Sequence, residues 1–226
     1  MVEKCDCLCD IGSDHAYIPI DLVLRGIVCK VIASDIRKGP CKIALCNILE
    51  NNLSDKIEVR MGNGFERIGN NECDSAVISG LGGHLMVNIF KESENITQTM
   101  NQIVIQPQNS LEYVREYLYT NGYDISDELL IYDEDKFYTV MSVKYTGIIC
   151  RKDKIYYYIG QKLIENKDKY LGKYLEKEIK RLKRILKNVD KEECKWLLRE
   201  YEKIESQIRY YTDIIKNQRH ITTQIP

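Results

Sequence analysis

The sequence predicts an α/β fold, a doubly wound parallel sheet followed by a C-terminal antiparallel coiled-coil hairpin of helices. Short apolar segments alternate with segments of helical spacing over residues 1–148. Polar or glycine-rich loops follow successive predicted strands, which is typical of a ligand site at the carboxyl edge of the sheet. Apolar residues at alternating spacings of three and four then repeat within residues 149–226. We therefore expect a ligand-binding domain over residues 1–148 and a helical hairpin over residues 149–226.

Length and composition limit the class of protein. The chain has 226 residues, enough for one domain with a sizeable core and an appendage. It contains no run of about 18 apolar residues and no export signal is predicted. Its nine cysteines, an odd number, favour reduced thiols over a disulfide framework. We therefore expect a cytoplasmic protein that does not bind membranes.

Three of the cysteines alternate along the first predicted strand. Cys5, Cys7 and Cys9 are expected to point to one face of the sheet and to pack in the core. A structural zinc site would require Cys-x-x-Cys spacing or neighbouring histidines. The chain has only three histidines, so we predict no structural metal site.

The first strand leads into the motif around which a ligand site is predicted. A short apolar strand ends on Asp10, and Gly12 permits a sharp turn before a helix over Ile18–Gly26. A dinucleotide fingerprint would need further glycines where Asp14 and Tyr17 stand, which argues against a nicotinamide cofactor. We expect the turn to hold S-adenosylmethionine with a carboxylate and free backbone N–H groups. A plain structural turn gives the same pattern, and that alternative stays open.

An acidic residue ends the second predicted strand, Val28–Ser34. Asp35 lies 23 residues after Gly12, close to the spacing at which α/β cofactor sites place a carboxylate for the ribose hydroxyls. A carboxylate suits that role because it accepts hydrogen bonds from both hydroxyls. Asp35 also stands where it would be the N-cap of the helix predicted over Gly39–Asn52, and both roles stay open.

Glycine-rich loops follow the third and fourth predicted strands. Ile57–Met61 leads into Gly62-Asn63-Gly64, where the Asn63 amide and exposed backbone amides would suit an adenine edge. As a bare turn signal, Asn-Gly is common. Asp74–Ser79 is apolar almost throughout, as expected for a parallel strand buried on both faces. It runs into Gly80-Leu81-Gly82-Gly83 and a further helix.

The last strand-helix unit and a hairpin complete the predicted sheet. Gln102–Gln106 is a fifth strand that ends at Pro107-Gln108-Asn109. A helix follows from Ser110, its expected N-cap, to Asn121. Leu129–Asp133 and Phe137–Lys144 alternate and contain β-branched residues, which predicts a closing hairpin.

In their order along the chain, these motifs resemble those of the bacterial tRNA (adenine-22-N1) methyltransferases. The motifs are Asp10-Ile-Gly-Ser-Asp-His-Ala-Tyr17, Asp35 with Gly39-Pro40, Gly62-Asn63-Gly64, Gly80-Leu-Gly-Gly83 and Ile105-Gln-Pro107. The similarity runs from residue 5 to about residue 145 and continues into a C-terminal helical hairpin. It implies a Rossmann-like, class I methyltransferase that transfers a methyl group from S-adenosylmethionine to N1 of adenine 22 in tRNA. The product S-adenosylhomocysteine and the absence of a metal follow from the same resemblance.

The resemblance also assigns roles to individual residues. It assigns to the methionine side of the cofactor Asp10, Gly12, Ser13 and Asp14. Asp35 and Ile36 are assigned to the ribose, and Gly62, Asn63 and Gly64 to the adenine. Gly80, Leu81 and Gly82 are assigned to the neighbourhood of the methyl group. Two positions depart from the pattern of most class I methyltransferases. Asp14 stands where most of them have a second loop glycine, a replacement that is itself typical of this family. His84 stands where a less bulky residue is expected. Family members usually carry a helix before the first strand, and its absence here is expected to expose one side of the cofactor pocket or to lower stability.

Motifs that are absent favour a ring nitrogen as the methyl acceptor. Methylation of an exocyclic amine typically uses an Asn/Asp-Pro-Pro-aromatic loop after the fourth strand, and methylation of a pyrimidine carbon requires a cysteine nucleophile. Neither stands in the loops that follow the fourth and fifth predicted strands. Adenine N1 has an in-plane lone pair, so proximity and alignment with the methyl group supply much of the rate.

The loops at the strand ends also hold the candidate catalytic and base-reading residues. We expect Asp14 to stabilise the positive charge that develops on the base, or to accept a hydrogen bond from its amine. His15 and Tyr17 are expected to position the base or stack on it, and Gln106 and Asn109 to read its edge. Each of the first three has a structural alternative: a helix cap for Asp14, a bond to a backbone carbonyl for His15, and a core position for Tyr17.

The C-terminal part differs from the rest in charge and periodicity. Residues 1–150 contain 13 Lys or Arg and 22 Asp or Glu, whereas residues 151–226 contain 20 and 12. A helical stretch is predicted over Lys152–Lys187, followed by a turn at Asn188 and a second helix. The expected capping box of that helix is Asp190 with Glu193. The seam of the hairpin is predicted at Leu175, Ile179, Leu182, Leu186 and Val189 in one helix and at Tyr201, Ile204, Ile208, Tyr211 and Ile215 in the other. Residues 220–226 are expected to be disordered.

Basic residues near the end of the first hairpin helix are candidate contacts to tRNA phosphates. They are Lys180, Arg181, Lys183, Arg184 and Lys187. A solvated lysine-rich face or a dimer arm would show the same pattern, and we expect a monomer or a weak dimer. Two other functions stay open from the sequence: a class I methyltransferase acting on a small molecule or protein, and a non-enzymatic RNA-binding protein that kept the fold without cofactor binding.

Overall fold

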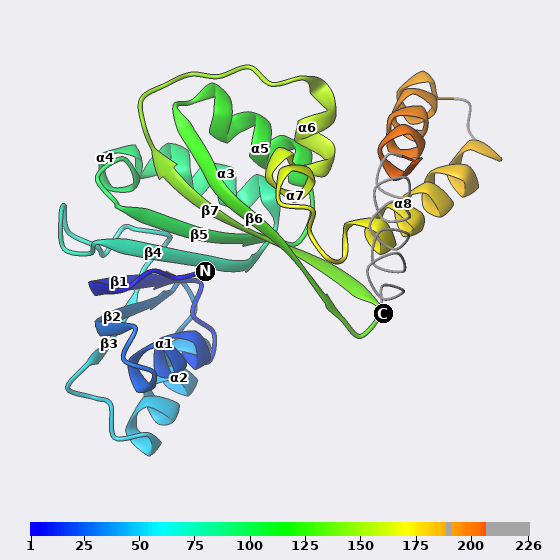
Figure 1. The fold of residues 1–226 in the computed structure, drawn as a ribbon. Coiled ribbons are helices and arrows are strands. Elements are labelled where there is room, and N and C mark those ends of the chain that lie inside the picture. Colours follow the sequence, from blue (N-terminus) through cyan, green and yellow to red (C-terminus); the bar gives the residue numbers. More distant parts are fainter. Residues whose placement is uncertain (189–190, 207–226) are drawn as a thin grey trace, which may run out of the picture.

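The computed structural model describes residues 1–188 and 191–206 and contains a seven-stranded sheet with helices on both faces (Figure 1). The strands are β1 (Cys5–Ile11), β2 (Val28–Asp35), β3 (Ile57–Met61), β4 (Ser75–Leu81), β5 (Gln102–Pro107), β6 (Tyr123–Asp133) and β7 (Lys136–Tyr145). Their order across the sheet is β3-β2-β1-β4-β5-β7-β6. β1 to β5 are parallel, whereas β7 runs antiparallel to both β5 and β6. The predicted doubly wound sheet with a closing hairpin is therefore confirmed.

Helices pack on the two faces of this sheet and define two apolar cores. The helices within residues 1–148 are α1 (Tyr17–Leu24), α2 (Lys38–Glu50), α3 (Gly83–Glu92), α4 (Glu94–Thr97) and α5 (Leu111–Thr120). α1 and α2 bury one core together with Leu8, and α3 and α5 bury the other together with Cys9. Adjacent residues of β1 thus face opposite cores, as the two-residue period of a strand requires. Both faces of the parallel strands are covered, so these strands are apolar along most of their length.

Three local predictions differ from the structure. β6 begins at Tyr123 rather than Leu129, because its first half alternates buried Tyr123 and Ile125 with exposed polar residues that the sequence pattern does not mark as a strand. The short helix α4 was not predicted. Ser110 does occupy the N-cap position of α5, but its φ is 50° and its hydroxyl makes no capping hydrogen bond.

The cysteines of β1 are only partly buried in the core. Cys9 is fully buried, and the half-buried Cys7 packs on the same core with its Sγ 3.5 Å from that of Cys73. Cys5 is half-buried and packs against the other core, so the prediction that all three side chains share one face is wrong for Cys5. All nine cysteines carry free thiols.

The C-terminal part begins with three helices, α6 (Lys154–Ile159), α7 (Gln161–Glu165) and α8 (Leu171–Leu186). The prediction of one helical stretch over Lys152–Lys187 is therefore wrong in detail. The chain breaks at Gly160, whose φ is 81°, and again around Lys167, whose φ is 51°. α6 lies against α5, and α7 lies against β6.

α8 and the helical segment 192–206 form the predicted hairpin, which we call the arm (Figure 1). Its seam is buried at Leu175, Ile179 and Leu182 of α8 and at Tyr201 and Ile204 of the second helix. An ion pair of 2.7 Å joins Lys183 Nζ to Glu202 Oε1 across the hairpin. The hairpin is thus confirmed within the described residues.

Some predictions fall on residues that lie outside the described ranges. They concern Val189, Asp190, Ile208, Tyr211, Ile215 and residues 220–226. The division of the chain into residues 1–148 and 149–226 stays a prediction. Over the described residues, none of the helices has the length and apolar character that crossing a membrane requires.

Candidate functional site

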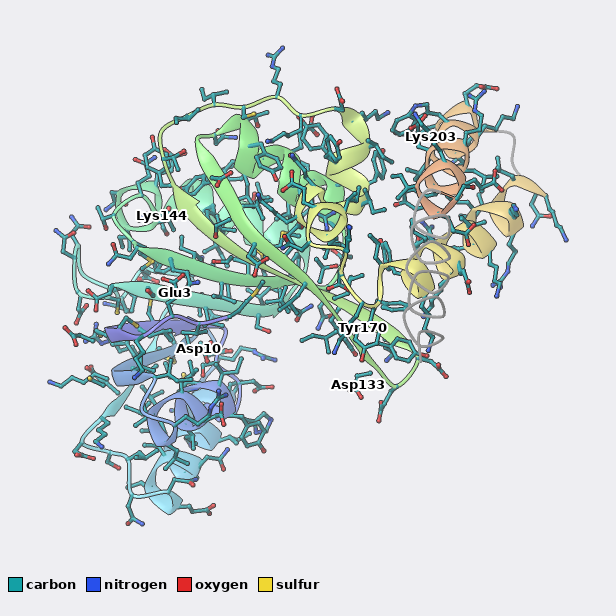
Figure 2. All side chains as sticks on the ribbon, in the orientation of Figure 1. Glu3, Asp10, Asp133, Lys144, Tyr170 and Lys203 are labelled. Atoms are coloured by element: carbon teal, nitrogen blue, oxygen red, sulfur yellow. The ribbon has the colours of Figure 1, made fainter. Side chains whose placement is uncertain are left out.

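Asp10 is a buried carboxylate near the carboxyl end of β1 (Figure 2). It stands between Ala33 of β2 and Val77 of β4 in the parallel register, so apolar strands flank it on both sides. Burial raises the pKa of Asp10 to about 6, and the nearby Ser13 hydroxyl partly opposes that shift. A carboxylate held in this environment favours a ligand that carries positive charge or hydrogen-bond donors.

The turn after β1 is tied to the end of β2. Gly12, with a φ of 82°, and Ser13 both donate their backbone N–H to the carbonyl oxygen of Ser34, at 2.8 and 2.9 Å. The expectation of free N–H groups at these two residues is therefore wrong. The unsatisfied groups are side chains instead: the buried hydroxyls of Ser13 and Ser34 have no hydrogen-bond partner among the described residues. Unpartnered buried hydroxyls are costly, and the Ser13 hydroxyl beside Asp10 fits a polar ligand such as S-adenosylmethionine.

Asp35, the last residue of β2, is a second buried carboxylate. Its Oδ1 accepts the backbone N–H of Arg37 at 2.7 Å and lies 3.5 Å from Nε of the same residue. The N-cap of α2 is Arg37 itself, so the alternative that Asp35 caps this helix is wrong. Hydrogen bonds among the described residues leave Oδ2 of Asp35 unused, and Ile36 beside it is 63% exposed. A carboxylate oxygen and an apolar side chain are thus both open to a ligand at this strand end.

The loop after β3 joins the same edge. Gly62 donates its N–H to the carbonyl oxygen of Asp35 at 3.1 Å. The N–H of Asn63 is bonded to Glu66 Oε2 at 3.2 Å, so this backbone amide is not free as expected. Asn63 is nevertheless exposed, and its side-chain amide forms no hydrogen bond within the described ranges. Gly64 adopts a φ of 52°, which suits a glycine.

Two amide side chains of the β5 end hold the loop after β4. Gln106 Oε1 accepts the N–H of Gly80 at 3.1 Å and the hydroxyl of Ser79 at 3.3 Å, and Asn109 Oδ1 accepts the N–H of Gly83 at 3.0 Å. A Cβ on Gly83 would lie 2.5 Å from the carbonyl oxygen of Asn109, so only glycine fits there. These structural roles were not predicted, because they depend on the pairing of β4 with β5.

The candidate catalytic residues follow the same turn. Asp14 is half-exposed, with its carboxylate 3.7 Å from His15 Nε2 and 4.0 Å from a terminal nitrogen of Arg37. His15 and Tyr17 stack with ring centroids 5.1 Å apart and an interplanar angle of 5°. The N-cap of α1 is Ala16, without any side-chain cap, and Tyr17 is 67% exposed. Neither the capping alternative for Asp14 nor the core alternative for Tyr17 is therefore correct.

The backbone of this turn is strained at a residue that is not glycine. Ala16 is buried and has a φ of 55°, in the left-handed region. The turn is held in this form by Asn47 of α2, whose Nδ2 donates to the carbonyl oxygen of His15 at 2.9 Å. Strain of this kind is found disproportionately at functional sites.

The predicted tRNA contacts lie along the exposed side of α8. Arg181 pairs with Glu178 at 2.7 Å, and Lys183 pairs with Glu202 at 2.7 Å. Lys180, Arg184 and Lys187 are exposed. Within residues 1–188 and 191–206, no group of three or more His, Cys, Asp or Glu side chains is arranged to hold a metal ion.

The chain is similar to known proteins over most of its length. The sequence model of a family described as "tRNA (adenine(22)-N(1))-methyltransferase" matches residues 8–213. The tRNA (adenine(22)-N(1))-methyltransferase of Bacillus subtilis (strain 168) is 34% identical over 134 residues, which are 59% of this chain and 56% of that protein. The aligned segment thus spans a little over half the length of that curated relative.

Solved structures extend this similarity to the whole fold. The Streptococcus pneumoniae protein Sp1610 in complex with S-adenosyl-L-methionine superposes with a TM-score of 0.84 and 26% identity, over 91% of this chain and 94% of that chain. M. capricolum TrmK in complex with S-adenosyl-homocysteine gives a TM-score of 0.74 and 29% identity, over 95% of this chain and 94% of the other.

Proposed function

Since this chain belongs to the tRNA (adenine(22)-N(1))-methyltransferase family, we propose that it transfers a methyl group from S-adenosylmethionine to N1 of adenine 22 in tRNA. One observation carries this proposal for the site itself. Two buried carboxylates, Asp10 and Asp35, and two buried hydroxyls, Ser13 and Ser34, lie at the carboxyl ends of the neighbouring strands β1 and β2, and the hydroxyls have no hydrogen-bond partner among the described residues. Such groups need a polar ligand that the protein chain does not supply.

The residues around this edge divide the cofactor between them. Asp10, Gly12, Ser13 and Asp14 face its methionine part, where the ammonium group would meet carboxylates. Asp35 and Ile36 receive the ribose, with Oδ2 of Asp35 accepting from the hydroxyls. The adenine lies against Gly62, Asn63 and Gly64. Gly80, Leu81 and Gly82 line the neighbourhood of the methyl group, and S-adenosylhomocysteine is the product.

The chemistry needs positioning and charge stabilisation more than proton transfer. S-adenosylmethionine supplies an electrophilic methyl group, and adenine N1 supplies a lone pair in the plane of the ring. Methylation leaves the base positively charged, so the half-exposed carboxylate of Asp14 stabilises that charge or accepts a hydrogen bond from the exocyclic amine. The stacked rings of His15 and Tyr17 offer a flat surface for the flipped base. Gln106 and Asn109 hold the loop on which the base rests.

The substrate is far larger than the edge of one sheet. We therefore assign to the C-terminal part of the chain, residues 149–226 in the predicted division, the task of holding tRNA through phosphate contacts. Lys180, Arg184 and Lys187 are exposed and available for such contacts. The protein works as a monomer or weak dimer in the cytoplasm, where mature tRNA is found.

Methyl transfer from labelled S-adenosylmethionine to unmodified tRNA tests the proposal. We expect incorporation into a transcript with adenine at position 22 and none into the matched transcript with guanine there. Asp14→Ala should lower the rate of methylation at least tenfold at saturating cofactor, whereas the exposed Asp21→Ala should leave that rate unchanged. Cofactor binding without methylation of either transcript would point to another substrate. A protein that binds no cofactor would contradict the proposal altogether.

A further inference from the structure

The arm and the carboxyl edge of the sheet enclose a cleft of about 810 Å³, which we call the arm cleft. Its walls come from the loop after β5, from the first residues of β7, and from α6, α8 and the segment 192–206. It begins at Gln106 and Asn109, the two residues that hold the loop after β4. The cleft therefore starts where the substrate base would enter the proposed methylation site.

A second groove, of about 500 Å³, continues the arm cleft along α8. The two share Phe137, Lys177, Glu178 and Arg181 in their walls. Near this junction, the rings of Tyr132, next to the tip of the β6–β7 hairpin, and Tyr170, just before α8, are 6.0 Å apart; Figure 2 labels Tyr170 and the neighbouring hairpin residue Asp133. The two grooves thus form one path, which leads from the loops of the site, past the β6–β7 hairpin, onto the exposed side of α8.

The charge of this path is positive, in contrast to the domain that it borders. Its walls contain six basic side chains, Lys136, Lys173, Lys177, Lys180, Arg181 and Arg184, against four acidic ones, Glu112, Asp135, Glu176 and Glu178. Residues 1–150 as a whole carry nine more acidic than basic residues. A local excess of basic groups beside the site favours a polyanion.

The path also offers aromatic rings that are only half-buried. Phe137 lies edge-on to Tyr174, with centroids 5.5 Å apart, and Lys177 Nζ is 5.5 Å from the centre of the Phe137 ring. Tyr138, the next residue of β7, also lines the arm cleft. Basic groups interleaved with partly open rings are how proteins hold single-stranded nucleic acid, because phosphates meet the charges and bases stack on the rings.

Lys183, near the end of α8, is less available than its charge suggests. Lys183 is paired across the hairpin with Glu202 at 2.7 Å, so binding a phosphate there would break an existing ion pair. Lys136, by contrast, is exposed at the mouth of the arm cleft. The strongest hold on RNA should therefore lie beside the site and not at the far end of α8.

We propose that the arm cleft binds the unstacked nucleotides of tRNA that flank the methylated adenine. Lys136 and Lys177 contact their phosphates, and Phe137 stacks on a neighbouring base. This inference rests on the proposed function and adds the path by which the strand leaves the site. A base removed from its stack leaves its neighbours unstacked as well, and the cleft compensates that loss.

Three double variants with the same change in charge test the inference. Lys136→Glu/Lys177→Glu alters the cleft, Lys183→Glu/Lys187→Glu alters the end of α8, and Lys30→Glu/Lys56→Glu alters exposed lysines near the amino ends of β2 and β3. Binding of an unmodified tRNA transcript is measured by fluorescence anisotropy with S-adenosylhomocysteine present. We expect a loss of affinity of at least tenfold for the first variant, less than threefold for the second and none for the third.

Two further measurements keep the outcomes separable. Cofactor affinity shows that each variant is folded, and Phe137→Ala, which changes no charge, should still weaken tRNA binding about threefold or more. Equal losses of tRNA affinity in the first two double variants, or no loss in the first, would overturn the inference. Methylation of adenine 22 by the wild-type protein would still uphold the proposed function in that case. If the wild-type protein binds cofactor but no tRNA, both proposals fail.

Discussion

Replacing Asp10 by asparagine tests whether the buried, ionised carboxylate of Asp10 lowers the stability of the ligand-free protein. Burial raises the pKa of Asp10 from 3.8 to about 6. A shift of about two pKa units corresponds to about 3 kcal/mol between the two protonation states, which the ligand-free protein loses when Asp10 is ionised. Asparagine keeps the shape and removes the charge. We therefore expect Asp10→Asn to raise the free energy of unfolding of the ligand-free protein by about 1–3 kcal/mol at pH 8.

The pH dependence gives this prediction its sign. Because the pKa of Asp10 is higher in the folded than in the unfolded chain, the folded state binds more protons between about pH 4 and pH 6. The penalty is absent below about pH 4, grows through that interval and is complete above about pH 6. The difference in stability between Asp10→Asn and wild type should shrink accordingly towards zero near pH 4. Urea unfolding followed by circular dichroism at several pH values measures it, with the exposed Asp6→Asn on the same strand as control.

The same substitution separates stability from ligand binding. S-adenosylmethionine carries a sulfonium and an ammonium group, and a neutral amide interacts with them less favourably than a carboxylate. Asp10→Asn should therefore lower cofactor affinity at least tenfold at pH 8, as measured by calorimetry. A variant that is less stable than wild type at pH 8, or one whose stability difference is the same at pH 5 and pH 8, would refute the reasoning. Unchanged cofactor affinity would remove Asp10 from the site.

Two further predictions concern the supports of the site and of the arm. Gly83→Ala places a Cβ 2.5 Å from the carbonyl oxygen of Asn109, so urea unfolding should show a loss of about 2 kcal/mol. At Gly172 no atom lies within 4 Å of a new Cβ, so Gly172→Ala should instead raise the free energy of unfolding by about 0.5–1 kcal/mol. Similar effects of the two substitutions would contradict the clash between the new Cβ at position 83 and Asn109. The buried carboxylate of Glu128 lies 2.8 Å from Arg115 Nε. Arg115→Met removes this partner and should lower the free energy of unfolding by about 3–5 kcal/mol. The double variant with Glu128→Leu should recover part of that loss in the same assay, and no recovery would show that the charge of Glu128 is not the cause.

The strand ends were predictable from the sequence because each one combines an apolar run with a polar or glycine residue. Asp10 and Asp35 end buried strands that the alternation of strands and helices makes parallel neighbours. Their common edge follows from topology alone. The hydrogen bonds of the turns were not predictable, since the N–H groups of Gly12 and Ser13 are used by Ser34, a residue of the neighbouring strand. Local sequence does not record which strand supplies that carbonyl group.

Contacts between distant residues explain the errors in the C-terminal part. Helical spacing predicts a continuous stretch through Gly160, but Glu128 Oε2 would lie 2.4 Å from a Cβ at that position. Arg115 binds this same glutamate and also donates to the carbonyl oxygens of Tyr157 and Tyr158, which fixes the end of α6 against α5. The break between α6 and α7 thus coincides with a buried ion pair between α5 and β6. Periodicity within one segment carries no trace of it.

Hydrogen bonds between neighbouring strand ends show where a ligand is needed. The turn after β1 is tied to β2 through Ser34, and the loop after β3 is tied to β2 through Gly62. The loop after β4 is tied to β5 through Gln106 and Asn109.

The pair that remains is β1 and β4, between which the order of the strands reverses. Among the described residues their loops meet through an apolar contact, since a Cβ on Gly12 would lie 3.4 Å from Leu81 Cδ2, and no hydrogen bond joins them. In open α/β sheets such a reversal is where ligands bind, because the connections diverge to opposite faces. Here stand the buried carboxylate of Asp10 and the Ser13 hydroxyl, which has no hydrogen-bond partner within the described ranges. A cofactor bound there would supply the polar link between β1 and β4 that the chain itself leaves out.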